Sequence, residues 1–319
     1  MQPLVSHPLD LNWQPQAVLL LAYGAAHSVE EVPAFVSHVR GGRETSPRQL
    51  QETADRYRQI GGCSPLHGIT NRTAKRLQQA INKPVYVGMR HSKPFIHETL
   101  AHMADQGVNS CVVICLAPHH SDMSIGAYHR ALVAGLQDLS YDLQYAFVQA
   151  WYNQPLLIQL WANAVQHMLR SAGLCAKQLQ DSHRLLFSAH SLPERIVKQG
   201  DAYPHQLRKT AQFVAFHAGL ALQSWELLFQ SAPPSPEKWL GPHIEDRLPE
   251  LAAQGVKQVF VVPIGFVSDH LEVLYDLDIL AHEIAQSHDM QLHRATMPND
   301  TPEFVAVLQS LIQGVCKQA

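Results

Sequence analysis

Short apolar runs alternate with longer amphipathic segments along most of the chain. The runs are rich in β-branched residues, and the segments between them are long enough to form crossover helices. This pattern predicts an α/β fold built on parallel sheets. We expect four strands in each half of the chain, at 17–22, 85–89, 111–116 and 145–149 and then at 185–188, 226–230, 258–262 and 292–295.

The chain of 319 residues is long enough for two domains, each with its own core. Each half contains a strand closed by a proline, Pro118 in the first and Pro263 in the second, which favours duplication of one α/β unit. We expect an N-terminal domain over 16–150 and a C-terminal domain over 151–301. A terminal helix within 302–319 is expected to pack back on the first domain.

Composition narrows the functional classes. The net charge of −3 and the lack of a long Lys/Arg run argue against a nucleic-acid partner. The five cysteines are scattered and suggest reduced thiols. The first 16 residues contain no Lys or Arg, so we expect no secretion signal and a cytoplasmic location. No apolar run approaches the roughly 20 residues of a spanning helix, so no transmembrane segment is predicted.

Ligands of open parallel sheets bind beyond the carboxyl ends of the strands, so residues at those ends are candidates for chemistry. His190 follows the predicted strand 185–188. A neutral imidazole there could accept a proton or bind a metal, or it could simply bond to neighbouring backbone. There is no P-loop and no GxGxxG after the first strand, so a nucleotide cofactor is not expected.

A run of acids follows the strand 258–262. Asp269 and Glu272 have the spacing of a helix-capping pair. Glu272 and Asp276 are four apart and so share one face of an α-helix, which Glu283 would continue. Such a strip could conduct protons or a hard divalent metal, and a histidine with carboxylates suits ferrous iron.

At these residues the sequence resembles the ferrochelatase family, and the resemblance runs through almost the whole chain. The segments that carry it are 21–24, 60–66, 116–119, 188–193, 200–204, 239–242 and 265–276. The resemblance implies two similar doubly wound, Rossmann-like domains of the chelatase fold with a porphyrin cleft between them. It also implies an enzyme of heme biosynthesis, a lyase that inserts ferrous iron into a porphyrin.

The resemblance assigns roles to individual residues. His190 and Glu272 match the catalytic pair, and His190, Glu272, Asp276 and His91 match metal-contacting positions. Tyr23 lies where coproporphyrin-using members carry a tyrosine that faces the iron, so coproporphyrin III is favoured over protoporphyrin IX. Residues expected to hold the macrocycle are Tyr23, Arg40, Arg56, Tyr57, Ser64 and Tyr128. Gly41 and Leu280 depart from the family pattern, and Glu283 could substitute for the acid missing at Leu280.

We expect porphyrin and ferrous iron as substrates, heme as product, a monomer, and neither a resident cofactor nor an iron–sulfur cluster. Three alternatives stay open. The chain could be a chelatase for a cobalamin or siroheme precursor, a non-catalytic heme-binding or heme-delivery protein that uses Tyr23 as ligand, or a generic α/β metal-binding protein. Each arginine expected at the porphyrin could also be an ordinary surface residue.

Overall fold

The computed structural model describes residues 4–6, 13–179 and 182–318. Its contacts divide the chain into two compact units. Unit 1 contains the described residues up to Trp151, together with Ser268–Leu271 and the residues from Asn299 onward, whereas unit 2 contains Tyr152–Val267 and Glu272–Pro298. The segment Ser268–Leu271 thus belongs with the first unit, which the predicted boundaries did not anticipate.

Unit 1 is built on a five-stranded sheet in the order β1-β5-β4-β2-β3. Its strands are β1 (Leu4–Val5), β2 (Ala17–Ala22), β3 (Val85–Met89), β4 (Ser110–Cys115) and β5 (Gln144–Val148). β2 is buried at every position, which explains its uninterrupted apolar sequence. Only β1 among these strands pairs antiparallel, and its two residues are too few for a periodic pattern to predict.

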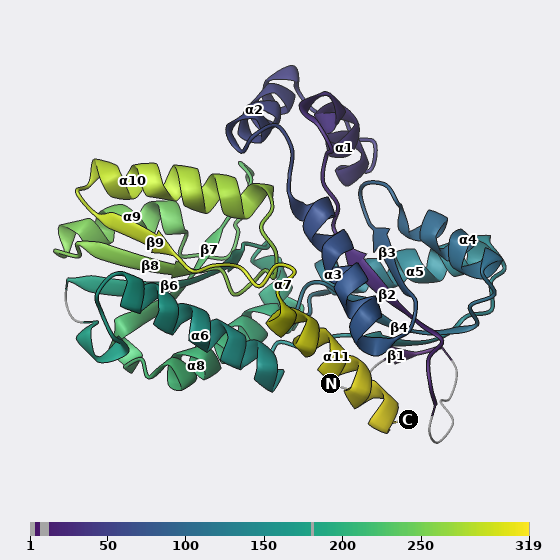
Figure 1. The fold of residues 1–319 in the computed structure, drawn as a ribbon. Coiled ribbons are helices and arrows are strands. Elements are labelled where there is room, and N and C mark those ends of the chain that lie inside the picture. The colour runs from purple at the N-terminus through teal and green to yellow at the C-terminus, as the bar shows by residue number, and fades with distance from the viewer. Residues whose placement is uncertain (1–3, 7–12, 180–181, 319) are drawn as a thin grey trace. The chain divides into compact units, whose positions relative to one another are not determined.

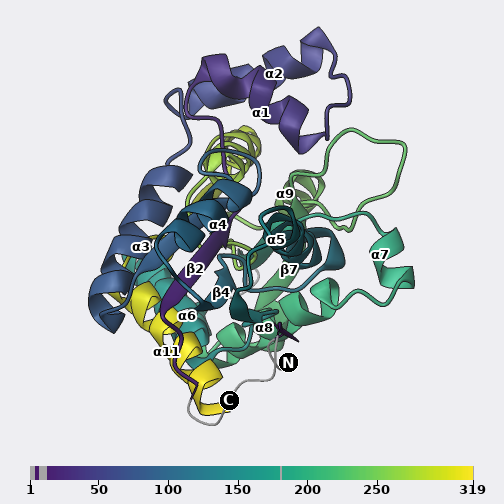
Figure 2. The ribbon, with the colours of Figure 1, turned by 90° about the vertical axis from the view of Figure 1, so that its right-hand side faces the viewer.

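Helices cover both faces of the unit 1 sheet. They are η1 (Val29–Glu31), α1 (Val32–Val39), α2 (Pro47–Gln59), α3 (Leu66–Ile81), α4 (Ile96–Asp105), the π-helical turn η2 (Asp122–Gly126), α5 (Ala127–Asp138) and α11 (Pro302–Gln318). α3 packs with α11, and α4 packs with α5 on the other face (Figures 1 and 2). The terminal helix α11 therefore lies in unit 1.

Unit 2 is built on a four-stranded, fully parallel sheet in the order β7-β6-β8-β9. Its strands are β6 (His183–His190), β7 (Trp225–Gln230), β8 (Gln258–Val262) and β9 (Gln291–Arg294). β6 runs two residues further than predicted at each end. His190 is therefore the last residue of a strand and not a residue beyond it.

Two helical layers enclose the unit 2 sheet (Figure 1). α6 (Pro155–Ser171) and α8 (Tyr203–Ala218) pack together on one face, with the short turns η3 (Ala176–Gln178) and η4 (Leu222–Ser224). The other face carries α9 (Ile244–Ala253), the π-helix η5 (Val273–Ala281) and α10 (His282–Ser287), while α7 (Arg195–Lys198) follows β6.

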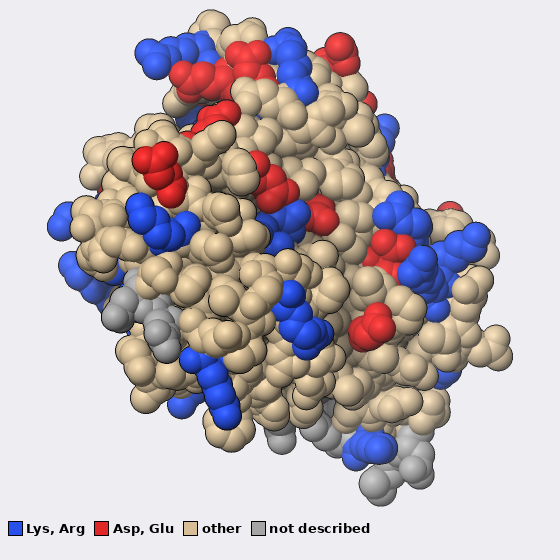
Figure 3. Space-filling view, turned by 60° about the vertical axis from the view of Figure 1, so that its left-hand side comes forward, with Lys and Arg blue, Asp and Glu red and all other residues tan. Residues whose placement is uncertain are grey.

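The charged side chains do not form a single-sign field on the face drawn in Figure 3, where Lys and Arg are interspersed with Asp and Glu. Among the described residues no helix is both long and apolar enough to cross a membrane.

Candidate active site

In unit 2 the backbone that follows β8 lies close to the end of β6, and this contact sets the positions of the candidate catalytic residues. Gly265 follows β8, and its N–H donates to the Ser188 carbonyl of β6 at 3.1 Å. A Cβ at Gly265 would lie 2.5 Å from the Ala189 Cβ and 2.7 Å from its Cα, so a larger residue would force the chains apart. The glycine lets the chain between β8 and η5 lie against the end of β6, where His190 is located.

His190 and Glu272 form a pair at this end of the sheet. The His190 Nε2 atom lies 3.4 Å from Glu272 Oε1, and the two side chains are 29% and 34% exposed. The His190 Nδ1–H donates to the Ser191 carbonyl, which leaves Nε2 facing the carboxylate. The pair can therefore exchange a proton and is accessible to a ligand.

The environment of His190 favours its protonated form. Burial by itself would lower the pKa of the imidazole, but the Glu272 carboxylate, the bond to Ser191 and the charge of Asp276 together raise it to about 9. At neutral pH the pair is thus an imidazolium beside a carboxylate.

Neighbouring polar groups hold the backbone of the pair in place. The Tyr203 hydroxyl donates to the His190 carbonyl at 2.9 Å. The Ser188 hydroxyl donates to Gln230 Oε1 at 2.8 Å, and Gln230 Nε2 donates to the Glu272 carbonyl at 3.4 Å. Sequence reasoning assigned no role to Tyr203 or Gln230; only the residue pairing between β6 and β7 brings Gln230 beside His190.

Asp276 is 3% exposed and accepts a hydrogen bond from the Ser231 hydroxyl. Glu283, which was expected to continue the acidic strip, is exposed. The reason is that Asp276 lies in a π-helix, whose hydrogen bonds close from i to i+5, so α-helical spacing does not apply there. Asp276 is thus buried and Glu283 is on the surface, whereas the proposed transport along the strip stays a prediction.

Asp269 does not pair with Glu272 as a helix cap. Its backbone N–H donates to Asn299 Oδ1 at 2.8 Å, and its Oδ2 accepts from Asn299 Nδ2 at 2.7 Å. Glu272 makes no capping bond at the start of η5. This carboxylate is therefore directed to His190 and not to the helix end.

Unit 1 contains a second cluster, of rings, around the residue that follows β2. Tyr23 is 42% exposed, and its ring centroid lies 4.6 Å from that of His91. His91 is 8% exposed, and its Nδ1 lies 3.1 Å from His38 Nδ1. Burial, then the charge of Arg90 and then His38 lower the pKa of His91 to about 3. His91 is therefore neutral at physiological pH, and its partner His38 was not predicted.

A tight turn presents Tyr23. Gly24 has φ +93°, and a Cβ there would lie 2.4 Å from Ser92 Oγ. The same hydroxyl accepts the Ala25 N–H at 3.2 Å.

The other residues expected at a porphyrin differ in how accessible they are. Tyr57 is 1% exposed and its hydroxyl accepts the Ala26 N–H at 3.1 Å, so it stabilises the turn after β2. Tyr128 and Ser64 are also buried. Arg56 is exposed on α2, whereas Arg40 ends α1 with its Nε buried and without a hydrogen-bond partner among the described residues.

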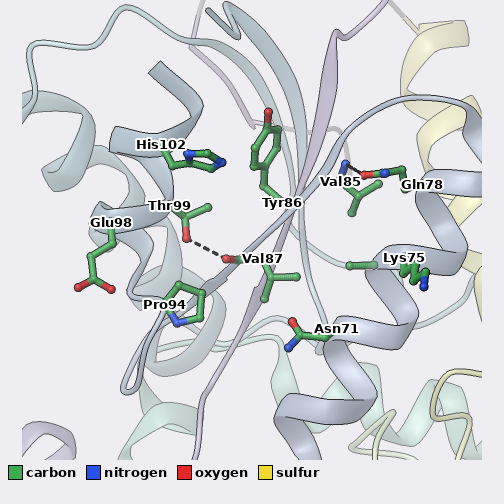
Figure 4. A pocket seen from close by; sticks show the side chains of 11 residues that line it. Asn71, Lys75, Gln78, Val85, Tyr86, Val87, Pro94, Glu98, Thr99 and His102 are labelled. Atoms are coloured by element: carbon green, nitrogen blue, oxygen red, sulfur yellow. Dashed lines mark hydrogen bonds between the residues drawn. The ribbon is translucent and has the colours of Figure 1, made fainter. Parts of the chain in front are cut away.

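A pocket of about 490 Å³ in unit 1 contains none of the predicted site residues (Figure 4). It lies along the outer edge of β3. There the Thr99 hydroxyl donates to the Val87 carbonyl at 2.8 Å, and Gln78 Oε1 accepts the Val85 N–H at 3.2 Å. These bonds satisfy edge groups that would otherwise pair with another strand.

Within the described parts of the chain, no group of three or more His, Cys, Asp or Glu side chains is arranged to hold a metal ion. A metal at His190 and Glu272 would need further ligands from a bound molecule.

The sequence model of the ferrochelatase family matches residues 15–315. The chain belongs to the ferrochelatase family. It is 37% identical over 307 residues to a ferrochelatase of Deinococcus radiodurans, covering 95% of this chain and 96% of that protein. It is also 36% identical over 310 residues to the coproporphyrin III ferrochelatase of Bacillus subtilis, covering 95% of this chain and 98% of the relative. As its family predicts, the chain is an enzyme, a metal chelatase.

Solved structures agree on the fold. SirB from Bacillus subtilis with Fe3+ superposes with a TM-score of 0.57 at 12% identity and covers 95% of this chain and 96% of its own. This likeness confirms the chelatase fold predicted for this member of the ferrochelatase family.

Proposed function

We propose that this enzyme inserts ferrous iron into coproporphyrin III in preference to protoporphyrin IX. The observation that carries the proposal is the His190–Glu272 pair, an imidazole nitrogen and a carboxylate oxygen 3.4 Å apart at the carboxyl end of a buried strand. The family and several relatives named coproporphyrin III ferrochelatase support the choice of substrate.

Insertion replaces two pyrrole protons by one iron ion, so the site must remove two protons for each Fe²⁺. His190 already carries a proton at neutral pH because its pKa is about 9. Fe²⁺ at Glu272 would compete with the imidazolium for the carboxylate and favour loss of that proton. The freed Nε2 lone pair then accepts the two pyrrole protons one after the other, and it releases the first before it takes the second. The pyrrole nitrogens supply the ligands that the two side chains lack.

Asp276 is the proposed relay for the protons that leave His190. It lies one helical turn beyond Glu272, and its charge contributes to the raised pKa of His190. The Ser231 hydroxyl donates a hydrogen bond to its Oδ2 atom.

Tyr23 and His91 are the proposed porphyrin and outer metal contacts of unit 1. The Tyr23 side chain is 42% exposed, so a ligand can reach it. Neutral His91 has the form that metal binding requires. Arg40 and Arg56 are proposed to bind porphyrin carboxylates, for which the planar guanidinium is suited. Tyr57, Ser64 and Tyr128, being buried, would act by shaping the surface around these groups.

We further propose that the enzyme works in the cytoplasm as a monomer, with no resident cofactor. The cysteines support the lack of an iron–sulfur cluster: Cys111 and Cys115 are buried in β4, and burial raises the pKa of both thiols, which disfavours the thiolates that ligate iron.

The experiment is anaerobic insertion, followed by the loss of free-porphyrin absorbance, with Fe²⁺ and coproporphyrin III, protoporphyrin IX or sirohydrochlorin in separate reactions. Fastest turnover with coproporphyrin III is expected. Faster turnover with protoporphyrin IX would keep the enzyme class and overturn the substrate, and preference for sirohydrochlorin would overturn both. Tight heme binding without insertion would indicate a carrier.

A further inference from the structure

The two helical layers of unit 2 carry opposite charges. The sequence contains no Asp or Glu at 143–180 or at 202–225, the stretches that include α6, η3, α8 and η4. Their Lys and Arg residues are all exposed, namely Arg170, Lys177, Arg208 and Lys209. We call the exposed side chains of these four elements the cationic face.

The opposite layer is acidic. α9, η5 and α10 contain Glu245, Asp246, Glu250, Asp276, Asp278 and Glu283 but only Arg247 as a permanent cation. Glu272, at the start of η5, belongs to the same layer. In unit 2 the positive side chains therefore lie on one side of the sheet and most carboxylates on the other. The candidate metal-contacting carboxylates are on the side opposite the cationic face.

The cationic face also carries the most exposed large apolar side chains among the described residues. Leu222 is 84% exposed and Phe216 is 80% exposed, followed on the same face by Leu156 at 45% and Phe213 at 40%. On α8 the residues Lys209, Phe213 and Phe216 follow one another at steps of four and three, so cation and rings share one side of the helix.

The elements of the face are continuous. α6 packs against α8. A Cβ at Gly219, directly after α8, would lie 3.9 Å from the Ala176 Cβ of η3, so Lys177 lies near the end of α8. A hollow of about 610 Å³ at this place is lined by residues that include Lys177, Gln223 and Arg184. The Arg184 guanidinium already faces Glu226 at 3.6 Å, so the unbalanced charge is that of the four exposed cations.

We propose that the cationic face docks on the surface of an anionic lipid bilayer, with Phe216 and Leu222 inserted among the headgroups. Basic residues beside protruding aromatic and aliphatic side chains are the combination that interfacial membrane binding uses. A protein partner would be expected to bury a contiguous apolar core, whereas here the apolar side chains stand among cations. Docking in this way leaves the acidic layer of unit 2, with Glu272, on the side of the sheet away from the lipid.

The test is co-sedimentation of the full chain with vesicles of phosphatidylglycerol and phosphatidylcholine, against vesicles of phosphatidylcholine alone. We expect binding to the anionic vesicles only, weakened by salt. The double variant Arg208→Gln/Lys209→Gln should bind about 30-fold more weakly, because each basic residue near an anionic surface contributes a factor of roughly 5 and the two factors multiply. The double variant Phe216→Ser/Leu222→Ser should bind roughly 10-fold more weakly, since the ring of Phe216 and the methyl groups of Leu222 leave water on insertion.

Leu139→Ser is the matched control, because it removes a side chain of unit 1 that is 41% exposed and lies outside the cationic face. It should bind as the wild type does. All the changed side chains are exposed, so insertion activity without vesicles should stay at the wild-type level and report correct folding. Lack of binding to anionic vesicles, or equal loss in the control, would overturn the proposal, as would binding only to an acidic protein.

Discussion

The histidines of the two candidate clusters have opposite electrostatic settings. His190 in unit 2 faces a carboxylate, and its pKa is raised to about 9 despite burial. His91 in unit 1 has no carboxylate among the groups that shift its pKa; burial, the charge of Arg90 and then His38 lower it to about 3. Both residues lie at sheet ends and both resemble family positions, so the difference arises from their neighbours. Under the proposed function, unit 2 would provide the proton chemistry, whereas unit 1 would offer neutral rings.

The largest expected effect is on catalysis by His190→Ala. Removing a general base typically costs 10²–10⁴-fold, so we expect iron insertion to fall by about 10³-fold while coproporphyrin binding, measured by fluorescence quenching, persists. His91→Ala should lower insertion by less than about 10-fold, since a histidine that stays neutral does not take up a pyrrole proton during the reaction. Equal losses in the two variants would remove the proposed division between the units.

Glu272→Gln should have the next largest effect, about 10²-fold on insertion. It also removes the carboxylate that raises the pKa of His190, while burial, which lowers it, remains. NMR titration should show a His190 pKa near 9 in the wild type and a lower pKa in the variant, where the Ser191 carbonyl and the charge of Asp276 still favour the protonated form. A pKa that stays near 9 would show that Glu272 is not the cause.

The pKa shifts of His190 and His91 also predict how the free energy of unfolding depends on pH. His190 contributes stability in full below about pH 6.5, and this contribution is lost as pH rises to about 9. His91 acts in the opposite sense: the unfolded chain takes up its proton below about pH 6.5, so stability falls from there toward pH 3. In chemical denaturation the wild type should be more stable than Glu272→Gln below about pH 6.5, and this difference should shrink as pH rises toward about 9.

Gly265→Ala tests the backbone approach that brings the pair together. The added Cβ would overlap Ala189, and we expect a loss of about 1–3 kcal/mol in the free energy of unfolding together with reduced insertion. Gly314→Ala is the control, because nothing lies within 4 Å of its added Cβ and it is in helix α11. That variant should be neutral or slightly more stable; equal destabilisation of both would argue against a special contact at Gly265.

Ser231→Ala should give the smallest effect. It removes the hydroxyl that donates to Asp276, so proton relay weakens while His190 and Glu272 stay in place. We expect insertion to slow by about 3–10-fold, the scale of about 1 kcal/mol for one hydrogen bond. Unchanged kinetics across the pH range would remove Asp276 from the relay.

Strand positions could be predicted where tertiary context added little. β2, β3 and β8 begin and end at the predicted residues. β2 and β8 are almost wholly buried, and buried parallel strands have continuous apolar sequences. The pair β1–β5 could not be predicted, since two exposed residues in β1 carry no pattern and depend on β5 for their bonds. His190 and Glu272 were found through motifs, whereas Gln230, Ser231 and His38 have no local signal.

The sequence by itself determined the alternation of strands and helices, the family, the identity of the candidate pair and the lack of acids on α6 and α8. Tertiary structure decided what those residues do. The π-helix exposes Glu283 and buries Asp276, Gly265 brings the end of β8 against β6, and Asn299 takes Asp269 away from the helix end. A pKa and a hydrogen bond depend on distances between residues far apart in the chain, and only the folded packing sets those distances.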